Sequence, residues 1–227
     1  MSNKREQAVS DRRERIFEAA YQIVATEGLD GLTTRGLAKL AGLTVPTLYN
    51  LVGGKDEIIS QLVLRDVDAI WDRLDFDSCA TALDMADAII DEAYEVIRIE
   101  KAFHRAVLPA MIDLNIVLAA NPMHDDAGAR AANRCVDMAT HACRVALDNG
   151  QLRGNLAPQE LGQQMFITYR GPMRDWLEGV IGDAEMLRRQ RRGFYIVMAA
   201  DASEEFRAVL LDRIAKLTEA NTIEEAA

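Results

Sequence analysis

Long apolar runs are absent from this sequence of 227 residues. No stretch approaches the roughly 18 consecutive apolar residues that a membrane helix needs, and the first residues are not followed by the apolar core of a signal peptide. We therefore expect a cytoplasmic protein that has no membrane partner.

Cysteine and histidine are scarce, at three residues each. Cys135 and Cys143 lie in a segment that we expect to be one helix, which places them ~12 Å apart, beyond the reach of a disulfide. The sequence contains no His-Glu-x-x-His spacing, no Gly-rich phosphate loop and no Ser or Cys in a nucleophile elbow. These absences argue against an enzyme, a bound metal and a cofactor, and they favour buried, reduced thiols.

Proline and aromatic residues are also few. Five prolines do not form a Pro-rich linker, and no low-complexity tract or repeat is present. Aromatic residues make up 6% of the chain while apolar residues make up 49%. We therefore expect a core that consists mainly of Leu, Ile, Val, Ala and Met.

Acidic residues exceed basic ones over the whole chain, whose formal net charge is −10. Residues 1–55 contain 8 Lys and Arg against 6 Asp and Glu, a net charge of +2, whereas residues 56–227 contain 18 against 30, a net charge of −12. An acidic protein with a basic first quarter can bind DNA through that quarter.

Apolar residues recur at helical spacing in nearly every segment, and no stretch shows the alternation of a strand, so we expect an all-α fold. Thr33 and Thr44 stand at N-cap positions, and Asp201 and Glu204 have the spacing of a capping box. Gly28 is a natural helix end. The predicted helices span residues 11–27, 33–41, 44–52, 55–74, 79–98, 100–120, 125–149, 158–181, 184–200 and 203–220.

The first three predicted helices have the lengths and the tight turn of a helix-turn-helix unit, in which the last helix lies in the major groove of DNA. This part of the chain contains Ile16, Ala19, Ala20, Gly28, Leu32, Thr33, Thr34, Leu37, Ala38, Ala41, Gly42, Pro46, Thr47, Leu48, Tyr49, Val52 and Lys55. Over about residues 12–58, this pattern resembles that of the tetracycline-repressor (TetR) family of transcriptional regulators.

Ten residues of this unit are predicted to bind DNA. Thr33 and Thr34 begin the second helix, where free N–H groups and hydroxyls can hold a phosphate. By the resemblance, Tyr49 contacts DNA and Lys55 binds a phosphate. The predicted residues are Thr33, Thr34, Arg35, Thr44, Val45, Pro46, Thr47, Tyr49, Asn50 and Lys55.

Residues at the start of the third helix are placed to contact bases. The hydroxyl of Thr44 can hydrogen-bond to a base edge, while Val45 and Pro46 can contact thymine methyl groups. Leu51 departs from the family, in which an aromatic residue is common here, and it cannot donate a hydrogen bond to a phosphate. One backbone contact of the family is therefore expected to be missing.

Several residues of this unit have a structural alternative. Arg35 can pair with guanine O6 and N7 or lie on a solvated helix face. The arginines at 5, 12, 13 and 15 can contact DNA from an N-terminal arm or be ordinary terminal charges. The apolar spacing predicts a small core made of Leu37, Ala38, Leu40, Leu43 and Leu48.

Residues 56–227 contain no diagnostic motif. The resemblance implies that they form a dimerising helical bundle with a ligand cavity, and that a bound ligand changes the spacing of two DNA-reading heads. We therefore predict two domains: residues 1–55 bind DNA, and residues 56–227 bind ligand and dimerise. Apolar stripes suited to a four-helix dimer interface contain Leu161, Met165, Tyr169, Met173, Trp176, Leu177, Leu187, Phe194, Val197 and Met198.

A ligand site is predicted where Pro109 and the Gly171-Pro172 pair interrupt helices. For each residue taken singly, a place in the plain core or on the surface is the favoured alternative. The predicted lining residues are Phe103, His104, Val107, Met111, Met138, Gln164, Phe166 and Tyr169, with Arg105 as a further polar anchor. The arginine-rich run 188–192 resembles a nucleic-acid patch, but the many acidic residues nearby favour a salt-bridged face.

The sequence thus favours a homodimeric regulator that binds a palindromic operator in double-stranded DNA and, as a repressor, is released by a small-molecule effector. A regulator controlled by a protein partner, or by no ligand, is the first alternative. A helical enzyme is a distant one.

Overall fold

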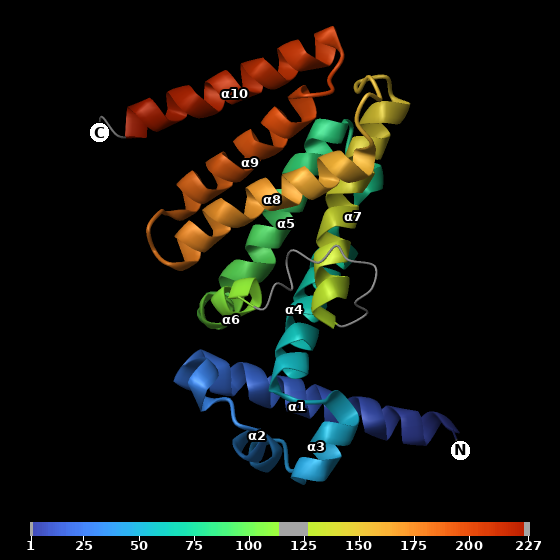
Figure 1. Cartoon of the computed structure of the whole chain (residues 1–227), viewed down its shortest axis with the longest axis vertical. Helices are drawn as coiled ribbons and strands as arrows, with labels where there is room; N and C mark the ends of the chain where they lie inside the picture. Colours follow the sequence, from blue (N-terminus) through green and yellow to red (C-terminus); the bar gives the residue numbers. More distant parts are fainter. Residues whose placement is uncertain (1, 114–126, 225–227) are drawn as a thin grey trace. The chain divides into compact units, whose positions relative to one another are not determined.

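The computed structural model of this protein describes residues 2–113 and 127–224, and the all-α prediction is confirmed there (Figure 1). The helices are α1 (Ser2–Gly31), α2 (Thr34–Leu40), α3 (Val45–Val52), α4 (Lys55–Arg73), α5 (Ala82–Ile99), α6 (Lys101–Asp113), α7 (Ala127–Asp148), α8 (Pro158–Leu177), α9 (Asp183–Ala199) and α10 (Glu204–Glu224), with a 3-10 turn, η1 (Phe76–Ser78). None of the described helices is long and apolar enough to cross a membrane.

Local chemistry sets most helix ends where the sequence predicts them. Thr33 caps α2 by accepting a hydrogen bond from the Gly36 amide at 3.1 Å, and Thr44 caps α3. Gly28 has a φ of 72°, which kinks α1 one turn before its end. The first helix begins earlier than predicted, at residue 2 instead of residue 11.

Asp201 does not form the predicted capping box with Glu204. Its buried carboxylate accepts hydrogen bonds from the amides of Gly154 and Asn155, at 2.9 and 3.1 Å. Ser203 instead precedes α10 and accepts a hydrogen bond from the Phe206 amide. The loop before α8 is therefore held to the loop before α10 by one carboxylate.

The described residues cluster into two compact units. The first contains residues 1–66 and 99–132, so α6 clusters with the helix-turn-helix segment, and α1 packs against α2, α3 and α6. Its apolar core includes Ile16, Ala20, Leu32, Leu37, Leu48, Val52, Ile58, Leu62, Phe103 and Val107. This burial orders the short helices α2 and α3, which are too short to be stable alone.

The second unit contains residues 67–98 and 133–227, in which α8, α9 and α10 follow one another in close packing (Figure 1). A Cβ on Gly162 of α8 would lie 2.7 Å from the Thr140 amide nitrogen of α7, so these two helices need a glycine at their contact. The three cysteines are free thiols, but only Cys143 is buried as predicted, while Cys79 and Cys135 are half-buried. Burial raises the pKa of the Cys143 thiol to about 12.

The apolar stripes of α8 and α9, which the sequence suggests for a dimer interface, lie mostly in the core of the single chain. Met165, Trp176, Phe194 and Met198 are buried within the single chain, as are most of the other residues of the two stripes. The side chains that these helices leave outside are different ones, namely Ile167 and Ile196, which are 52% and 55% exposed.

Candidate nucleic-acid interface

A short turn and two caps position the start of α3. Gly42 adopts a φ of 68° after α2, and the Leu43 amide donates to the Ala38 carbonyl at 2.8 Å, which closes the turn. The Thr44 and Thr47 hydroxyl oxygens then lie 2.8 Å apart at the first turn of α3. Leu48 and Val52 anchor the helix in the core, so its other face points outward.

The outward face of α3 contains the side chains that the sequence predicts to read DNA. Thr44, Pro46, Tyr49 and Asn50 are exposed, and Val45 and Thr47 are half-buried. Tyr49 is 51% exposed, and its hydroxyl has no hydrogen-bond partner in the described part of the chain. An aromatic ring held outward on a firmly packed helix is available for contact with another molecule.

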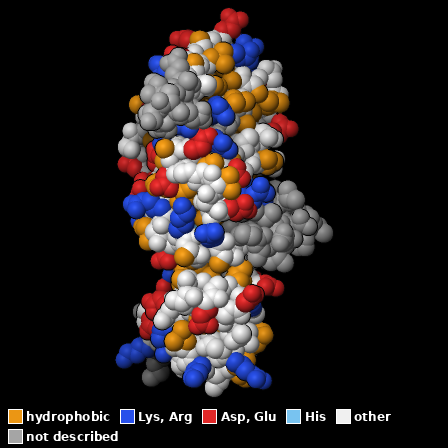
Figure 2. Space-filling view, turned by 90° about the vertical axis from the view of Figure 1, so that its left-hand side faces the viewer, with side chains coloured by type: hydrophobic (Ala, Val, Ile, Leu, Met, Phe, Trp, Pro, Cys, Tyr) orange, Lys and Arg blue, Asp and Glu red, His pale blue; other side chains and the backbone are white. Residues whose placement is uncertain are grey.

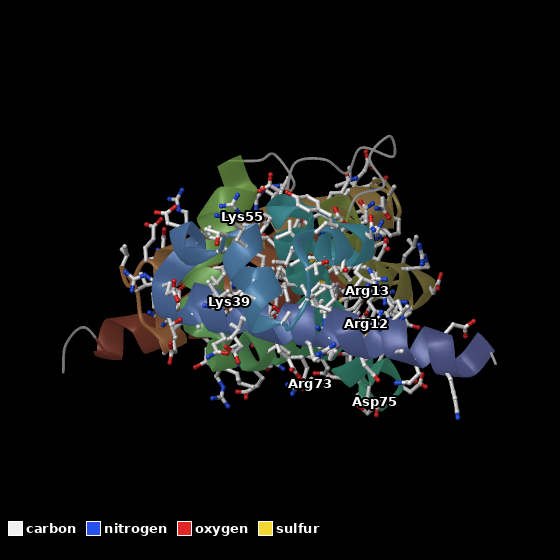
Figure 3. The ribbon with its side chains drawn as sticks, turned by 90° about the horizontal axis from the view of Figure 1, so that it is seen from below. Arg12, Arg13, Lys39, Lys55, Arg73 and Asp75 are labelled. Carbon is white, nitrogen blue, oxygen red and sulfur yellow. The ribbon has the colours of Figure 1, made fainter. Side chains whose placement is uncertain are left out.

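Unpaired cations surround α2 and α3. Arg12, Arg15, Arg35 and Lys39 are exposed and form no ion pair with any described residue. Lys and Arg side chains are visible on this unit at the lower end of Figure 2, and Arg12 and Lys39 are labelled in Figure 3. An anionic polymer such as DNA can neutralise these charges, whereas no carboxylate of the described chain does so.

Two cations that the sequence offers for DNA contact, the predicted phosphate ligand Lys55 and the open candidate Arg13, also form hydrogen bonds inside the unit. The Lys55 ammonium donates a hydrogen bond to the Leu29 carbonyl at the end of α1, and Arg13 donates to the Gln61 side chain at 3.2 Å (Figure 3). An ammonium has three donors, so Lys55 can bind a phosphate in addition. The hydrogen bond from Lys55 to Leu29 holds the end of α1 to the start of α4.

Lys39 was not predicted from the sequence, although it stands four residues after Arg35 on the same exposed face of α2. Leu40 was predicted to lie in the small core, and this is wrong because it is 50% exposed. Thr33 and Arg35 are exposed and Thr34 is half-buried, so the start of α2 presents its residues outward as expected.

The predicted ligand residues divide between the two units. Phe103, His104 and Val107 are buried in the first unit, and Met138 is buried in the second. Phe166 and Tyr169 are half-buried on α8, Arg105 is exposed on α6, and the Met111 side chain lies outside the described residues. Gln164 is exposed on α8, and its role as a polar anchor for a ligand stays a prediction.

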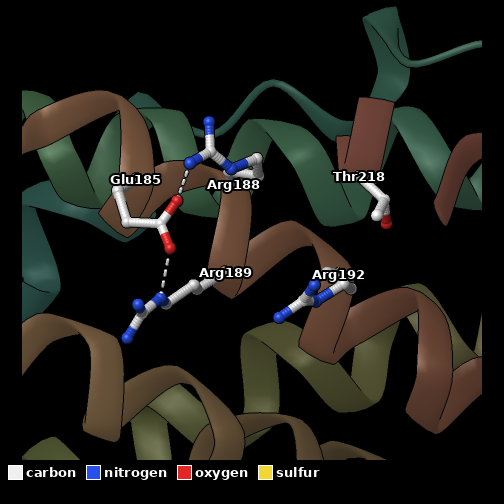
Figure 4. A pocket seen from close by; sticks show the side chains of 5 residues that line it. All are labelled: Glu185, Arg188, Arg189, Arg192 and Thr218. Carbon is white, nitrogen blue, oxygen red and sulfur yellow. Dashed lines mark hydrogen bonds and ion pairs between the residues drawn. The ribbon is translucent and has the colours of Figure 1, made fainter. Parts of the chain in front are cut away.

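A hollow of about 280 Å³ between α9 and α10 is lined by Glu185, Arg188, Arg189, Arg192 and Thr218 (Figure 4). Glu185 accepts hydrogen bonds from both Arg188 and Arg189. Asp175 is a second partner of Arg189, at 3.6 Å. Carboxylates of the chain itself thus pair with two of the three guanidinium groups of the hollow, as predicted for a salt-bridged face.

No group of three or more His, Cys, Asp or Glu side chains that could hold a metal ion occurs in the described ranges. The exposed face of α3, with Tyr49 outward and the exposed cations of α1 and α2 nearby in the same unit, forms the best-supported candidate site in the described part of the chain.

Comparison with known proteins finds similarity over the segment that contains this site. Residues 16–62 match the family described as bacterial regulatory proteins, tetR family. Over 53 residues the chain is 40% identical to the class D tetracycline repressor of Escherichia coli, and equally to the class H repressor of Photobacterium damsela subsp. piscicida. Each match covers 23% of this chain and 24% of the repressor, so the chain matches about a quarter of the length of these curated relatives.

Solved structures resemble most of the chain at low sequence identity. A TetR regulator from Rhodococcus sp. RHA1 has a TM-score of 0.63 at 14% identity, covering 82% of this chain and 94% of that one. SmeT, described as the repressor of the Stenotrophomonas maltophilia multidrug efflux pump SmeDEF, has a TM-score of 0.61 at 20% identity, covering 86% and 93%. These structures show the fold over most of the chain, and residues 16–62 are similar to the tetR family of bacterial regulatory proteins.

Proposed function

We propose that this chain is a dimeric transcriptional regulator that binds a palindromic DNA operator through α2 and α3 and represses transcription from it. The observation that carries the proposal is the outward face of α3, with Tyr49 exposed beside the unpaired cations of α1 and α2. Uncharged side chains at the start of α3 suit base contacts, and the flanking cations suit phosphates.

Dimerisation is part of the proposal because one head has little charge. Residues 1–55 carry a net charge of only +2, while the rest of the chain is acidic. Two linked heads bind neighbouring half-sites with a high effective concentration, which raises affinity without extra charge. The acidic remainder disfavours adhesion to unrelated DNA.

The proposal also includes release of the regulator from its operator when a small-molecule effector binds. Similarity of residues 16–62 to proteins named as tetracycline repressors supports it. Control by a protein partner, or by no ligand, is the alternative. A small molecule that releases bound DNA favours the effector, whereas release only by another protein favours the alternative.

The test is selection of bound sequences from a random pool of DNA duplexes, followed by footprinting of the selected duplex. We expect a palindrome whose two halves are protected equally, with the protein sedimenting as a dimer. Binding should weaken steeply as salt is added, because phosphate contacts release counterions. Failure to enrich any sequence, or protection of a single asymmetric half-site by a monomer, contradicts the proposal.

A further inference from the structure

Three polar side chains from three helices meet inside the first unit. The Tyr21 hydroxyl of α1 donates a hydrogen bond to Asp66 Oδ1 of α4 at 2.6 Å. On the other side of the carboxylate, His104 Nε2 of α6 lies 3.3 Å from Asp66 Oδ2. The His104 side chain is 3% exposed and that of Asp66 is 18% exposed, while the Phe103 ring packs on Tyr21 with centroids 4.2 Å apart.

Two atoms of this cluster are buried without a hydrogen bond, namely Asp66 Oδ2 and His104 Nε2. They face one another at close range, yet their geometry does not form a bond. Buried polar atoms are rarely left in this state, because each has given up its water without replacement. When the neutral His104 ring carries its proton on Nδ1, Nε2 is an acceptor, and a proton on the Asp66 carboxyl group that is donated from Oδ2 to Nε2 would satisfy both atoms.

The surroundings of Asp66 favour that proton. The pKa of Asp66 is raised to about 6, chiefly because of burial and to a smaller extent because of Glu100, while the hydrogen bond from Tyr21 and the charge of Arg65 act in the opposite direction. Arg65 is itself paired with Glu14 of α1. Burial lowers the pKa of His104 to about 4, so its ring stays neutral while Asp66 takes up a proton.

We propose that Asp66 is a positioning residue for the DNA-reading head, and that the Tyr21, Asp66 and His104 side chains hold α1, α4 and α6 together fully only when Asp66 is protonated. The DNA part of this inference rests on the proposed function. Since α1 packs directly against α2 and α3, a firmly held α1 presents α3 in one orientation. A head ordered in advance loses less entropy on DNA and binds more tightly.

The direction of the pH effect follows from the two groups. With a pKa of about 6 in the fold against 3.8 for a free carboxyl, Asp66 contributes stability that is present at low pH and lost as pH rises through about 6. His104 has the opposite effect over a similar pH range. Its pKa is lower in the fold, about 4, than the 6.5 of a free imidazole, so the stability of the fold falls as pH decreases through this range. A variant is therefore needed to distinguish the effect of Asp66 on stability from that of His104.

Asp66→Asn provides that separation, since its amide can accept from Tyr21 and donate to His104 at every pH. We expect its Tm to equal that of the wild type at pH 5 and to exceed it by about 4 °C or more at pH 7.5. Asp72→Asn is the matched control, because Asp72 is an exposed acid of the same helix with no partner among the described residues. Its Tm should follow the wild type at both pH values.

Tyr21→Phe gives an independent check that keeps the ring. It removes the hydrogen bond that lowers the pKa of Asp66, so the midpoint of the pH effect should move to higher pH. If the Tm difference between Asp66→Asn and the wild type does not change with pH, the proposal that the Asp66 carboxyl group takes up a proton in the fold is refuted.

Duplex binding tests the positioning role. With the selected duplex as probe, Asp66→Asn should bind as tightly as the wild type at pH 5.5 and at least about fivefold more tightly at pH 7.5. An affinity ratio that stays constant with pH, alongside a pH-dependent Tm difference, overturns the positioning role. If no protein binds any duplex, the proposed function fails, while the Tm profiles still decide whether Asp66 holds the proton.

Discussion

Thr44 connects the stability of the recognition helix with its proposed contact to DNA. Its hydroxyl oxygen lies 3.4 Å from the Thr47 amide that it caps and 2.8 Å from the Thr47 hydroxyl, yet the residue is exposed. The same oxygen can therefore fix the start of α3 and face a base edge. Such a dual role is readable from the sequence, because an N-cap is recognised by residue type and position alone.

Replacing Thr44 by Ala should lower the free energy of unfolding by about 1 kcal/mol, because the Thr47 amide loses its acceptor. Thr44→Ser is the matched control, since it keeps the hydroxyl and should stay near the wild type. Urea denaturation measures both. Equal stability of the Ala and Ser variants would show that the cap does not contribute.

Other residues were less predictable, for reasons of tertiary structure. Leu40 has the residue type and spacing of a core position, but the packing of α2 leaves it exposed. His104 was considered as a ligand anchor, whereas its ring lies against Asp66, a residue 38 positions earlier in the sequence. Periodicity along one helix does not identify such a partner on another helix.

Among the elements, α8 and α9 show both the strength and the limit of sequence periodicity. Apolar spacing correctly predicts that both are helices with a buried face. It does not show which partner covers that face, and here the chain covers it itself. A Cβ on Gly193 of α9 would lie 3.1 Å from Thr168 of α8, so these two helices pack closely and leave Ile167 and Ile196 outside.

We predict that these two exposed isoleucines contribute to the dimer contact. The double substitution Ile167→Glu with Ile196→Glu should give a folded monomer, because four carboxylates would have to be buried in the dimer. Sedimentation equilibrium measures the mass. Val209→Glu, at an equally apolar exposed site on α10, should remain a dimer, and a dimeric double variant would place the interface elsewhere.

At the scale of the described chain, the distribution of charge fits the proposed function of DNA binding through the first unit. The exposed cations around α2 and α3 have no partner in the described chain, whereas Arg134, Arg174, Arg189 and Arg191 of the second unit are paired with carboxylates. The sequence already indicates this separation through the charges of its first 55 residues. Only the structure shows which arginines are neutralised.

The division into units is a feature that the sequence does not reveal. A boundary at residue 55 follows the helix-turn-helix motif, but α6 clusters with the first unit through its contacts with α1. Contacts between segments some 80 residues apart leave no local signal in the sequence. This arrangement brings His104 to Asp66 and makes the positioning role of that cluster testable.

The most direct test of the DNA-binding face is the affinity of Tyr49→Ala and Lys55→Ala for the selected duplex at moderate salt, measured by fluorescence anisotropy. Lys216→Ala is the control, because it removes an exposed lysine from α10. We predict that each head variant keeps its dimeric state and helical spectrum but binds about tenfold or more weakly, while the control binds as the wild type does. Wild-type affinity in both head variants would contradict the assignment of this face to DNA.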